Sequence, residues 1–273
     1  MLEHDISQRR EIRRVFAGLM VILGLGAIDQ SIVATALPRI VNDLGDVTYL
    51  PWIVTGYVFS STITMPLYGR LADIFGRRPL IYIAVLTFLT GSALSGFAQS
   101  LPQLVIFRVV QGVGAGGFLP LSQILIGDYV PPHLRGKQQG AFVAVFAVCS
   151  VIGPVLGGVI TDLMSWRWIF YVNLPIGGIA LIVISIALSE RPRTHKGRLD
   201  IMGALLMSSC TAIFLLLVMF GGSEWPWLSA ETAILSIGCT LLLMLFVRHI
   251  QRTPEAVLPV DRKRISEAHL IGA

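Results

Sequence analysis

The chain has 273 residues, of which 54% are hydrophobic and only 14% are charged, and its mean hydropathy is +0.75. A soluble globular domain carries about 25% charged residues, so this composition excludes an ordinary soluble domain. The formal net charge of +5 would by itself also suit an acidic partner such as nucleic acid.

Eight apolar segments follow one another along the chain. We predict membrane-spanning helices over residues 15–37, 52–69, 80–98, 104–127, 138–161, 168–188, 201–220 and 232–247. Most of them reach the roughly 20 residues that cross a ~30 Å hydrocarbon core, and Asp29 and Arg108 are their only charged residues. A backbone in lipid must satisfy its own hydrogen bonds. The predicted fold class is therefore an all-α polytopic membrane protein.

The basic residues lie on one side of these spans. Of the 21 Lys and Arg residues, 18 fall in the amino-terminal segment, in every second connection and in the tail. Cytoplasmic loops of membrane proteins are enriched in these residues, so we expect both termini to be cytoplasmic. The basicity is thus interpreted as membrane topology, with the lipid bilayer and not nucleic acid as the partner.

Connections and charge runs divide the chain into five parts. We expect a cytoplasmic segment at 1–14, six helices within 15–188, a cytoplasmic linker at 189–200, an additional helix pair within 201–250, and a cytoplasmic tail at 251–273. The tail contains Pro254, Pro259 and a basic cluster and ends in mid-pattern at Ala273. We therefore expect the chain to be the front part of a longer protein.

The first and fourth spans each carry one buried charge. At 1.5 Å per residue, Asp29 lies roughly 9 Å below the outer surface of the hydrocarbon core and Arg108 about 6 Å below it. Carboxylates at such depth usually face a cavity, a partner or a proton path. An Asp that gains and loses contact with an Arg can release and bind a proton. The alternatives are a static ion pair and an Arg108 that extends outward to the membrane surface.

The second connection, from Gly69 to Leu80, is short and charged. We predict a tight loop in which Asp73 caps a helix amino terminus and the arginines pair with it or with carboxylates of a neighbouring helix. Such a loop would clamp two helices, whereas the alternative is a solvated turn. Its candidate residues are Gly69, Arg70, Asp73, Gly76, Arg77 and Arg78.

Glycine-rich runs mark the fourth and fifth spans. Gly112 to Gly117 fits the nucleotide-binding pattern GxGxxG, but that pattern requires a preceding strand and here lies within an apolar span. We interpret it as close helix packing through small residues. In the fifth span, Gly153 to Gly158 surround Pro154, which predicts a kinked, closely packing helix. The aromatic run that begins at Trp166 and Trp168 fits an interfacial belt.

Catalytic and metal-binding patterns are not found in the sequence. Cys149, Cys210 and Cys239 have no CxxC spacing, which argues against a zinc site. The sequence has no HExxH pattern, and its histidines lie in connections or at span edges. We therefore expect no metal, no cofactor and no enzymatic activity.

Taken together, these patterns resemble the major facilitator superfamily of transporters, and in particular its fourteen-helix drug:proton antiporter branch. The motifs, in chain order, are Asp29 to Pro38, Gly69 to Leu80, Arg108 to Gly114, Gly153 to Gly158 and Trp166 to Pro175. The resemblance implies a six-helix half followed by two extra helices. A second six-helix half, which the family also has, is missing from the 273 residues.

The resemblance also implies roles for particular residues. It makes Asp29 and Arg108 the proton-coupling pair, the loop around Asp73 a cytoplasmic gate, and the fifth-span glycines an antiporter motif. Beside the substrate path it places Gln111, Gly112, Gly114 and Gly116; the antiporter motif comprises Gly153, Pro154, Gly157 and Gly158. The expected partners are protons and a small organic substrate, and the expected location is the plasma membrane.

Two other functions fit the same sequence. One is a porter of the same superfamily for a specific metabolite or siderophore, which a substrate screen would separate from a drug exporter. The other is a non-transporting membrane protein, such as a truncated product or a partner subunit.

Overall fold

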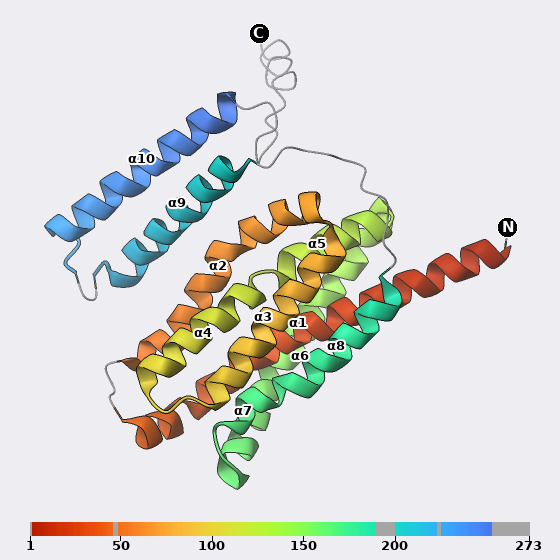
Figure 1. Cartoon of the computed structure of the whole chain (residues 1–273), viewed down its shortest axis with the longest axis horizontal. Helices are drawn as coiled ribbons and strands as arrows, with labels where there is room; N and C mark the ends of the chain where they lie inside the picture. Colours follow the sequence, from red (N-terminus) through yellow and green to blue (C-terminus); the bar gives the residue numbers. More distant parts are fainter. Residues whose placement is uncertain (1, 46–48, 189–199, 223–224, 253–273) are drawn as a thin grey trace. The chain divides into compact units, whose positions relative to one another are not determined.

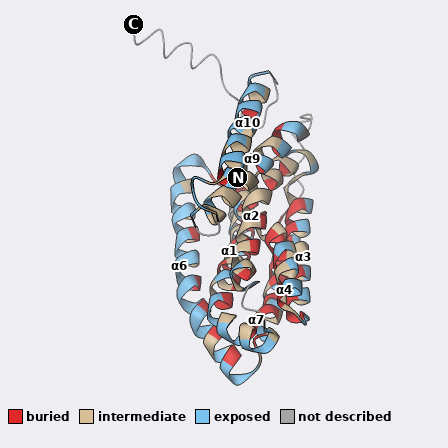
Figure 2. Cartoon of the chain, turned by 90° about the vertical axis from the view of Figure 1, so that its left-hand side faces the viewer, coloured by how far each residue is buried: buried red, intermediate tan, exposed pale blue. Residues whose placement is uncertain are grey.

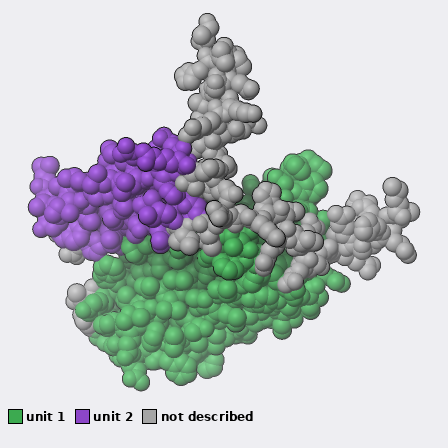
Figure 3. Space-filling view, turned by 45° about the horizontal axis from the view of Figure 1, so that its top comes forward, with its two compact units in different colours: residues 1–194 green, residues 195–273 purple. Residues whose placement is uncertain are grey.

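The computed structural model describes residues 2–45, 49–188, 200–222 and 225–252 (Figure 1). The predicted linker 189–200 lies outside the described residues except for Asp200, and so does the predicted tail after Arg252. The regular structure in the described ranges is helical, which confirms the predicted all-α fold. The chain divides into two compact units, residues 1–194 and residues 195–273, which Figure 3 colours separately.

The first unit is a bundle built around two central helices. Helix α1 packs mainly against α6 and α8, and α4 packs mainly between α2 and α3. The bounds are α1 Leu2–Leu44, α2 Leu50–Phe75, α3 Arg77–Gly96, α4 Leu101–Ala115, α5 Phe118–Tyr129, α6 Pro132–Leu163, α7 Trp168–Tyr171 and α8 Asn173–Ala187. Proline at the first or second position starts α2, α4 and α6, where its missing N–H costs nothing.

Seven of the eight predicted spans coincide with helices that are long and apolar enough to cross a membrane. The predicted span 52–69 is helical over its whole length, as part of the 26-residue α2. It falls short in apolarity because Ser60, Ser61, Thr62 and Thr64 interrupt it, and their hydroxyls bond to carbonyls on the preceding turn of the same helix.

Several element boundaries differ from the prediction. Helix α1 continues through Pro38 to Leu44, beyond the predicted end at residue 37. The predicted span 104–127 is divided into α4 and α5 at Gly116 and Gly117, where the N–H of Gly117 bonds to the carbonyl of Gly114 at 3.1 Å. Glycine has low helix propensity, so a glycine run is a natural place for this break. The predicted span 168–188 is likewise divided into α7 and α8.

Two apolar clusters form the interior of the first unit. Val15, Leu19, Ile22 and Leu25 of α1 belong to one cluster, and Ile32, Val33, Ala36 and Ile40 of the same helix belong to the other. Asp29 lies in the sequence between these two stretches of α1 and is itself fully buried. Figure 2 shows a different distribution along α6, where exposed residues predominate. Many of these are apolar, such as Val143 and Val151, as expected of a helix side that meets lipid or another apolar surface.

The second unit contains the helix pair α9 (Ile201–Phe220) and α10 (Ala230–Arg252). Asp200 caps α9 by accepting a hydrogen bond from the N–H of Gly203 at 2.8 Å, and it also contacts His249 Nε2 of α10 at 2.6 Å. Midway along the pair, the sulfur atoms of Cys210 and Cys239 lie 4.0 Å apart. These contacts fix the alignment of the two helices.

Candidate functional site

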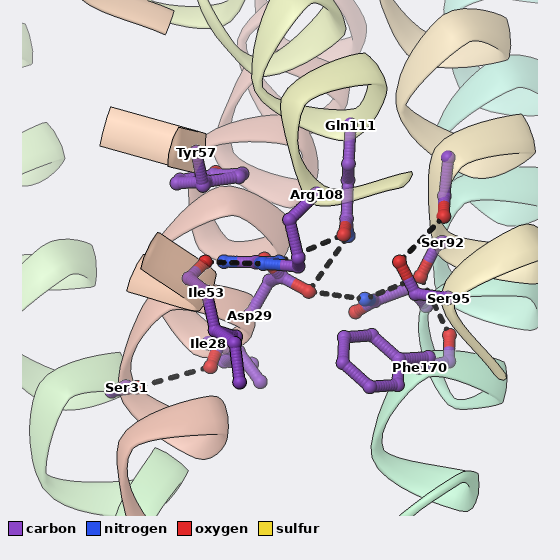
Figure 4. Close-up of polar contacts among 12 residues, drawn as sticks. Ile28, Asp29, Ser31, Ile53, Tyr57, Ser92, Ser95, Arg108, Gln111 and Phe170 are labelled. Carbon is purple, nitrogen blue, oxygen red and sulfur yellow. Dashed lines mark hydrogen bonds and ion pairs between the residues drawn. The ribbon is translucent and has the colours of Figure 1, made fainter. Parts of the chain in front are cut away.

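Asp29, near the middle of the apolar part of α1, accepts three hydrogen bonds at a position that solvent does not reach. Arg108 Nη1 donates to Oδ2 at 2.7 Å, and the side-chain amides of Gln111 and Asn173 donate to Oδ1 at 2.8 and 2.7 Å. Arg108 and Gln111 lie one turn apart on α4, and Asn173 begins α8. The contacts of Asp29 with Arg108 and Gln111 can be followed in Figure 4. All three partners are donors, so the site is built for a carboxylate.

Arg108 is held from several sides and is only 1% exposed. Its Nη1 also donates to Gln111 Oε1 at 2.7 Å, and its Nε donates to the carbonyl of Ile53 at 3.3 Å. The guanidinium carbon lies 4.1 Å from the ring centroid of Tyr57, a favourable cation–π distance. Arg108 therefore does not extend outward to the membrane surface, which excludes that alternative.

A chain of hydrogen bonds leads from Asp29 to two further helices. The second Nδ2 hydrogen of Asn173 is donated to Ser92 Oγ of α3 at 2.9 Å, and Ser92 in turn donates to the carbonyl of Phe170 in α7 at 2.8 Å. Both Asn173 and Ser92 are fully buried. The site thus joins α1, α3, α4, α7 and α8, with α2 contributing the carbonyl of Ile53.

Glycines of α4 bring its neighbours close to the site. A Cβ atom at Gly112 would collide with Ser60 and with the carbonyl of Tyr57 on α2, and one at Gly114 would lie 2.5 Å from the carbonyl oxygen of Ala84 on α3. At Gly116 the same atom would collide with Thr64. The predicted close packing therefore takes place against α2 on one side and α3 on the other.

Of the four residues of the fifth-span motif, two glycines pack against α1, whereas the third glycine and the proline do not. Gly153 and Gly157 are buried against Ser31, Ile32 and Thr35 of α1. Gly158 has open space where a Cβ would be, and Pro154 is exposed within a helix that remains continuous past it.

The predicted loop after Gly69 is shorter than expected because α2 continues to Phe75. Asp73 therefore does not cap a helix amino terminus, because it lies near the carboxyl end of α2. The residue before α3 is Gly76, with a φ of 92°, a value that favours glycine. The arginines do pair with carboxylates as predicted. Arg77 Nε lies 2.9 Å from Asp128 Oδ2 of α5, and Arg77 Nη2 lies 4.0 Å from Asp73 Oδ1.

The two other arginines of this connection also contact neighbouring groups. Arg70 lies 3.9 Å from Asp73, and Arg78 donates to the carbonyl of Ser185 in α8 at 3.4 Å. Gly69 lies inside α2, and a Cβ at this position would meet open space. The connection thus ties the end of α2 and the start of α3 to α5 and α8.

Charged contacts also join helices near the carboxyl end of α1. Arg39 pairs with Asp162 and donates to the carbonyl of Thr161, both of α6, and Asp43 accepts from Arg167 at 2.8 Å and from Trp166 Nε1 at 2.9 Å. The ring of Trp166 is buried and its Nε1 binds α1, so this side chain packs inside the bundle. Trp168, which is 47% exposed, remains compatible with the predicted interfacial belt.

The arrangement places one buried carboxylate among three hydrogen-bond donors. Within the described residues, no group of three or more His, Cys, Asp or Glu is placed to bind a metal ion. The sequence pattern of the Major Facilitator Superfamily matches residues 19–203, which include every residue that contacts Asp29. The chain belongs to the major facilitator superfamily. It is therefore an integral membrane protein of a transporter family, not an enzyme.

Relatives within the superfamily and one solved structure agree with this assignment. The multidrug transporter protein MdtP of Bacillus subtilis is 37% identical over 90% of this chain, and the MFS-type efflux pump LUC4 of Fusarium is 41% identical over 81%. The chain covers only 46% and 40% of these two proteins. The human organic anion transporter MFSD10 has the same fold, with a TM-score of 0.61 at 20% identity, over 84% of this chain and 60% of that one.

Sequence reasoning did not identify Asn173 or Ser92 as partners of Asp29. Asn173 belongs to the run from Trp166 to Pro175, a pattern that resembles the superfamily. The interfacial-belt interpretation of this run rests on its aromatic residues and assigns no role to the asparagine. A polar amide at the start of an apolar helix was the available signal. For Ser92 there was no signal, because a serine in an apolar helix usually bonds to its own backbone.

Proposed function

We propose that this chain is the amino-terminal portion of a proton-coupled exporter of small organic compounds, of the fourteen-helix branch, that works by alternating access in the plasma membrane. The observation that carries the proposal is the buried ion pair of Asp29 and Arg108, since ionisable groups inside a membrane mark ion and proton paths by default. Export is supported by the two relatives, a multidrug transporter and an efflux pump.

Asp29 would take up a proton in one conformation of the transporter and release it in the other. In the geometry described here, Arg108 Nη1 lies 2.7 Å from Asp29 Oδ2, so the carboxylate has a positively charged partner. A conformational change that moves α4 away from α1 would remove this charge, and burial without a partner favours the neutral acid. The geometry described here then corresponds to the deprotonated state.

Two other groups of residues would act at a distance from the proton. The connection around Asp73, with the pair of Arg77 and Asp128, would hold the cytoplasmic ends of α2, α3 and α5 together as a gate. Gly153 and Gly157 would let α6 move against α1, since glycine contacts allow two helix backbones to approach closely. Both chain termini would be cytoplasmic.

The test is Asp29→Asn in a full-length transporter that carries this chain. We expect loss of efflux driven by a pH gradient, because the amide cannot take up the proton, and the efflux is compared at equal amounts of membrane-inserted protein. Asp43→Asn is the matched control, since it removes a carboxylate from the exposed end of the same helix. Efflux that still follows the pH gradient in Asp29→Asn would rule out the assignment.

A further inference from the structure

One buried oxygen beside Asp29 has no hydrogen bond. Asn173 is fully buried and donates both Nδ2 hydrogens, to Asp29 Oδ1 at 2.7 Å and to Ser92 Oγ at 2.9 Å. Its Oδ1 is buried without a hydrogen-bond partner among the described residues. Leaving a buried acceptor without a hydrogen bond is unfavourable, because the group has given up its bonds to water. An amide kept at this cost, next to a group that binds and releases a proton, requires an explanation.

The hydrogen-bond donors around Asp29 suit only its charged form. Once Asp29 carries a proton, its O–H needs an acceptor where it now meets a donor. Arg108 has no acceptor. Gln111 has one, Oε1, but this oxygen already accepts from Arg108 Nη1 at 2.7 Å, and turning the amide would place an NH₂ group against the guanidinium. Asn173 is the remaining side chain bonded to Asp29, and its acceptor is unused.

We propose that Asn173 is a positioning residue whose side-chain amide turns over when Asp29 is protonated, so that Oδ1 accepts the carboxylic acid O–H. This inference rests on the proposed proton uptake by Asp29. The step breaks no covalent bond: the proton stays on Asp29, and Oδ1 and Nδ2 of Asn173 exchange places. Oδ1, which has no partner among the described residues in the deprotonated state, gains the O–H of Asp29, and the Nδ2 hydrogens leave Asp29 Oδ1 and Ser92 Oγ.

The turn of Asn173 would reach α3 and α7 through Ser92. In the present geometry Ser92 accepts from Asn173 and donates to the carbonyl of Phe170 at 2.8 Å. After the turn, Ser92 Oγ would face Asn173 Oδ1, and two acceptors in contact repel. Rotating the hydroxyl toward Asn173 restores a hydrogen bond there and releases the carbonyl of Phe170. Protonation on α1 would thereby loosen the bond between α3 and α7.

The other polar groups around Asp29 do not compete for this role. Among the described residues, the charged or titratable groups with a contact at this site are Arg108 from α4 and, over its guanidinium, Tyr57 from α2. From α3 and α8 come the neutral side chains of Ser92 and Asn173. A pH-dependent change in the Asn173 amide therefore reports on Asp29.

The chain offers a simple way to observe this amide, because its only asparagines are Asn42 and Asn173. In an Asn42→Gln variant of the 273-residue chain, asparagine labelled with ¹³C at the side-chain carbonyl marks Asn173 alone. Infrared difference spectra in lipid nanodiscs, between high and low pH, then report its C=O stretch together with the carboxyl bands. We expect the labelled band to move to lower frequency at low pH, in step with the loss of the Asp29 carboxylate band, because Oδ1 gains a hydrogen bond.

The control is Asp29→Leu in the same labelled background, in which the Asn173 band should not respond to pH. A labelled band that stays constant while Asp29 titrates would overturn the proposal and leave the proposed transport function standing. A shift of the band combined with unimpaired pH-driven efflux in Asp29→Asn would support the turn of Asn173 and overturn the proposed role of Asp29 in transport. An Asp29 carboxylate that persists at every pH at which the chain stays folded would overturn both.

Discussion

At the scale of single residues, Asp29 and Arg108 neutralise one another in a place where either charge alone would be costly. Their side chains are 0% and 1% exposed, and two amides, Gln111 and Asn173, complete the hydrogen bonds of the carboxylate. Removing one member of a buried ion pair typically costs about 3–5 kcal/mol, whereas replacing both is often neutral. Replacing one residue of this pair should therefore lower the stability of the chain more than replacing one residue of a surface pair.

We expect Arg108→Gln to lower the thermal unfolding midpoint of the purified chain strongly, because it leaves the Asp29 carboxylate without its positive partner. The double variant Asp29→Asn with Arg108→Gln should regain most of the loss. Arg39→Gln is the control: its pair with Asp162 is more than half exposed, and such pairs contribute about 0–1 kcal/mol. Equal losses in Arg108→Gln and Arg39→Gln would contradict this account.

The sequence predicts part of this residue-level arrangement. Counting residues from the span ends places Asp29 and Arg108 at similar depth, because rise per residue is constant in a helix. It does not identify Ser92, since the rotation of one helix against another decides whether a serine faces its own backbone or a neighbour. That rotation depends on packing across helices and not on any local pattern.

At the scale of elements, glycines determine which helices come close together. Gly157 and Gly158 are adjacent on α6, yet a Cβ at Gly157 would lie 2.8 Å from the carbonyl oxygen of Ile32 on α1, whereas one at Gly158 would meet open space. The family motif contains both residues and does not distinguish them. The structure does, because adjacent helical residues point in directions about 100° apart.

We expect Gly157→Ala to lower the thermal stability of the chain and Gly158→Ala to leave it unchanged or raise it. In the first variant α6 must move away from α1, while in the second alanine gains up to about 1 kcal/mol of helix propensity over glycine. Unfolding midpoints measured in one detergent give the comparison. If the two variants behave alike, the contact between α6 and α1 is not the one described.

The alignment of α9 with α10 can be tested through Cys210 and Cys239, whose sulfur atoms lie 4.0 Å apart. We expect a membrane-permeant thiol oxidant to join them within one chain, with a loss of two hydrogen masses, after a movement of about 2 Å to the disulfide bond length of 2.05 Å. Cys149 of α6 should keep its thiol, and Cys210→Ser should abolish the link. A product that contains Cys149 would contradict the alignment of the pair.

At the scale of the whole molecule, the sequence predicts the fold class well and the element boundaries less well. Apolar length and the absence of charge identify spans because lipid imposes those requirements on any helix. They do not reveal that the span from residue 104 to 127 is two helices, since Gly116 and Gly117 are uncharged like their neighbours. They also rank α2 below the other spans, although α2 is a full helix of the bundle that contacts Arg108 through Ile53 and Tyr57.

The length of the chain leads to the last prediction. The chain covers 46% of MdtP and 40% of LUC4, and transporters of this kind bind substrate between two halves that move against one another. We expect liposomes containing only the 273-residue chain to show no efflux driven by a pH gradient. Liposomes containing full-length MdtP, assayed with the same dye substrate, provide the positive control.

The same preparation separates loss of transport from loss of the site. In the labelled chain alone, the Asp29 and Asn173 bands should still respond to pH, because every residue that bonds to Asp29 lies within the first unit. Proton binding without transport is the combination expected from the proposed function, in which this chain supplies the proton site but only one wall of the substrate path. Sustained efflux by the chain alone would mean that the first unit forms a complete path by itself or by association of several copies.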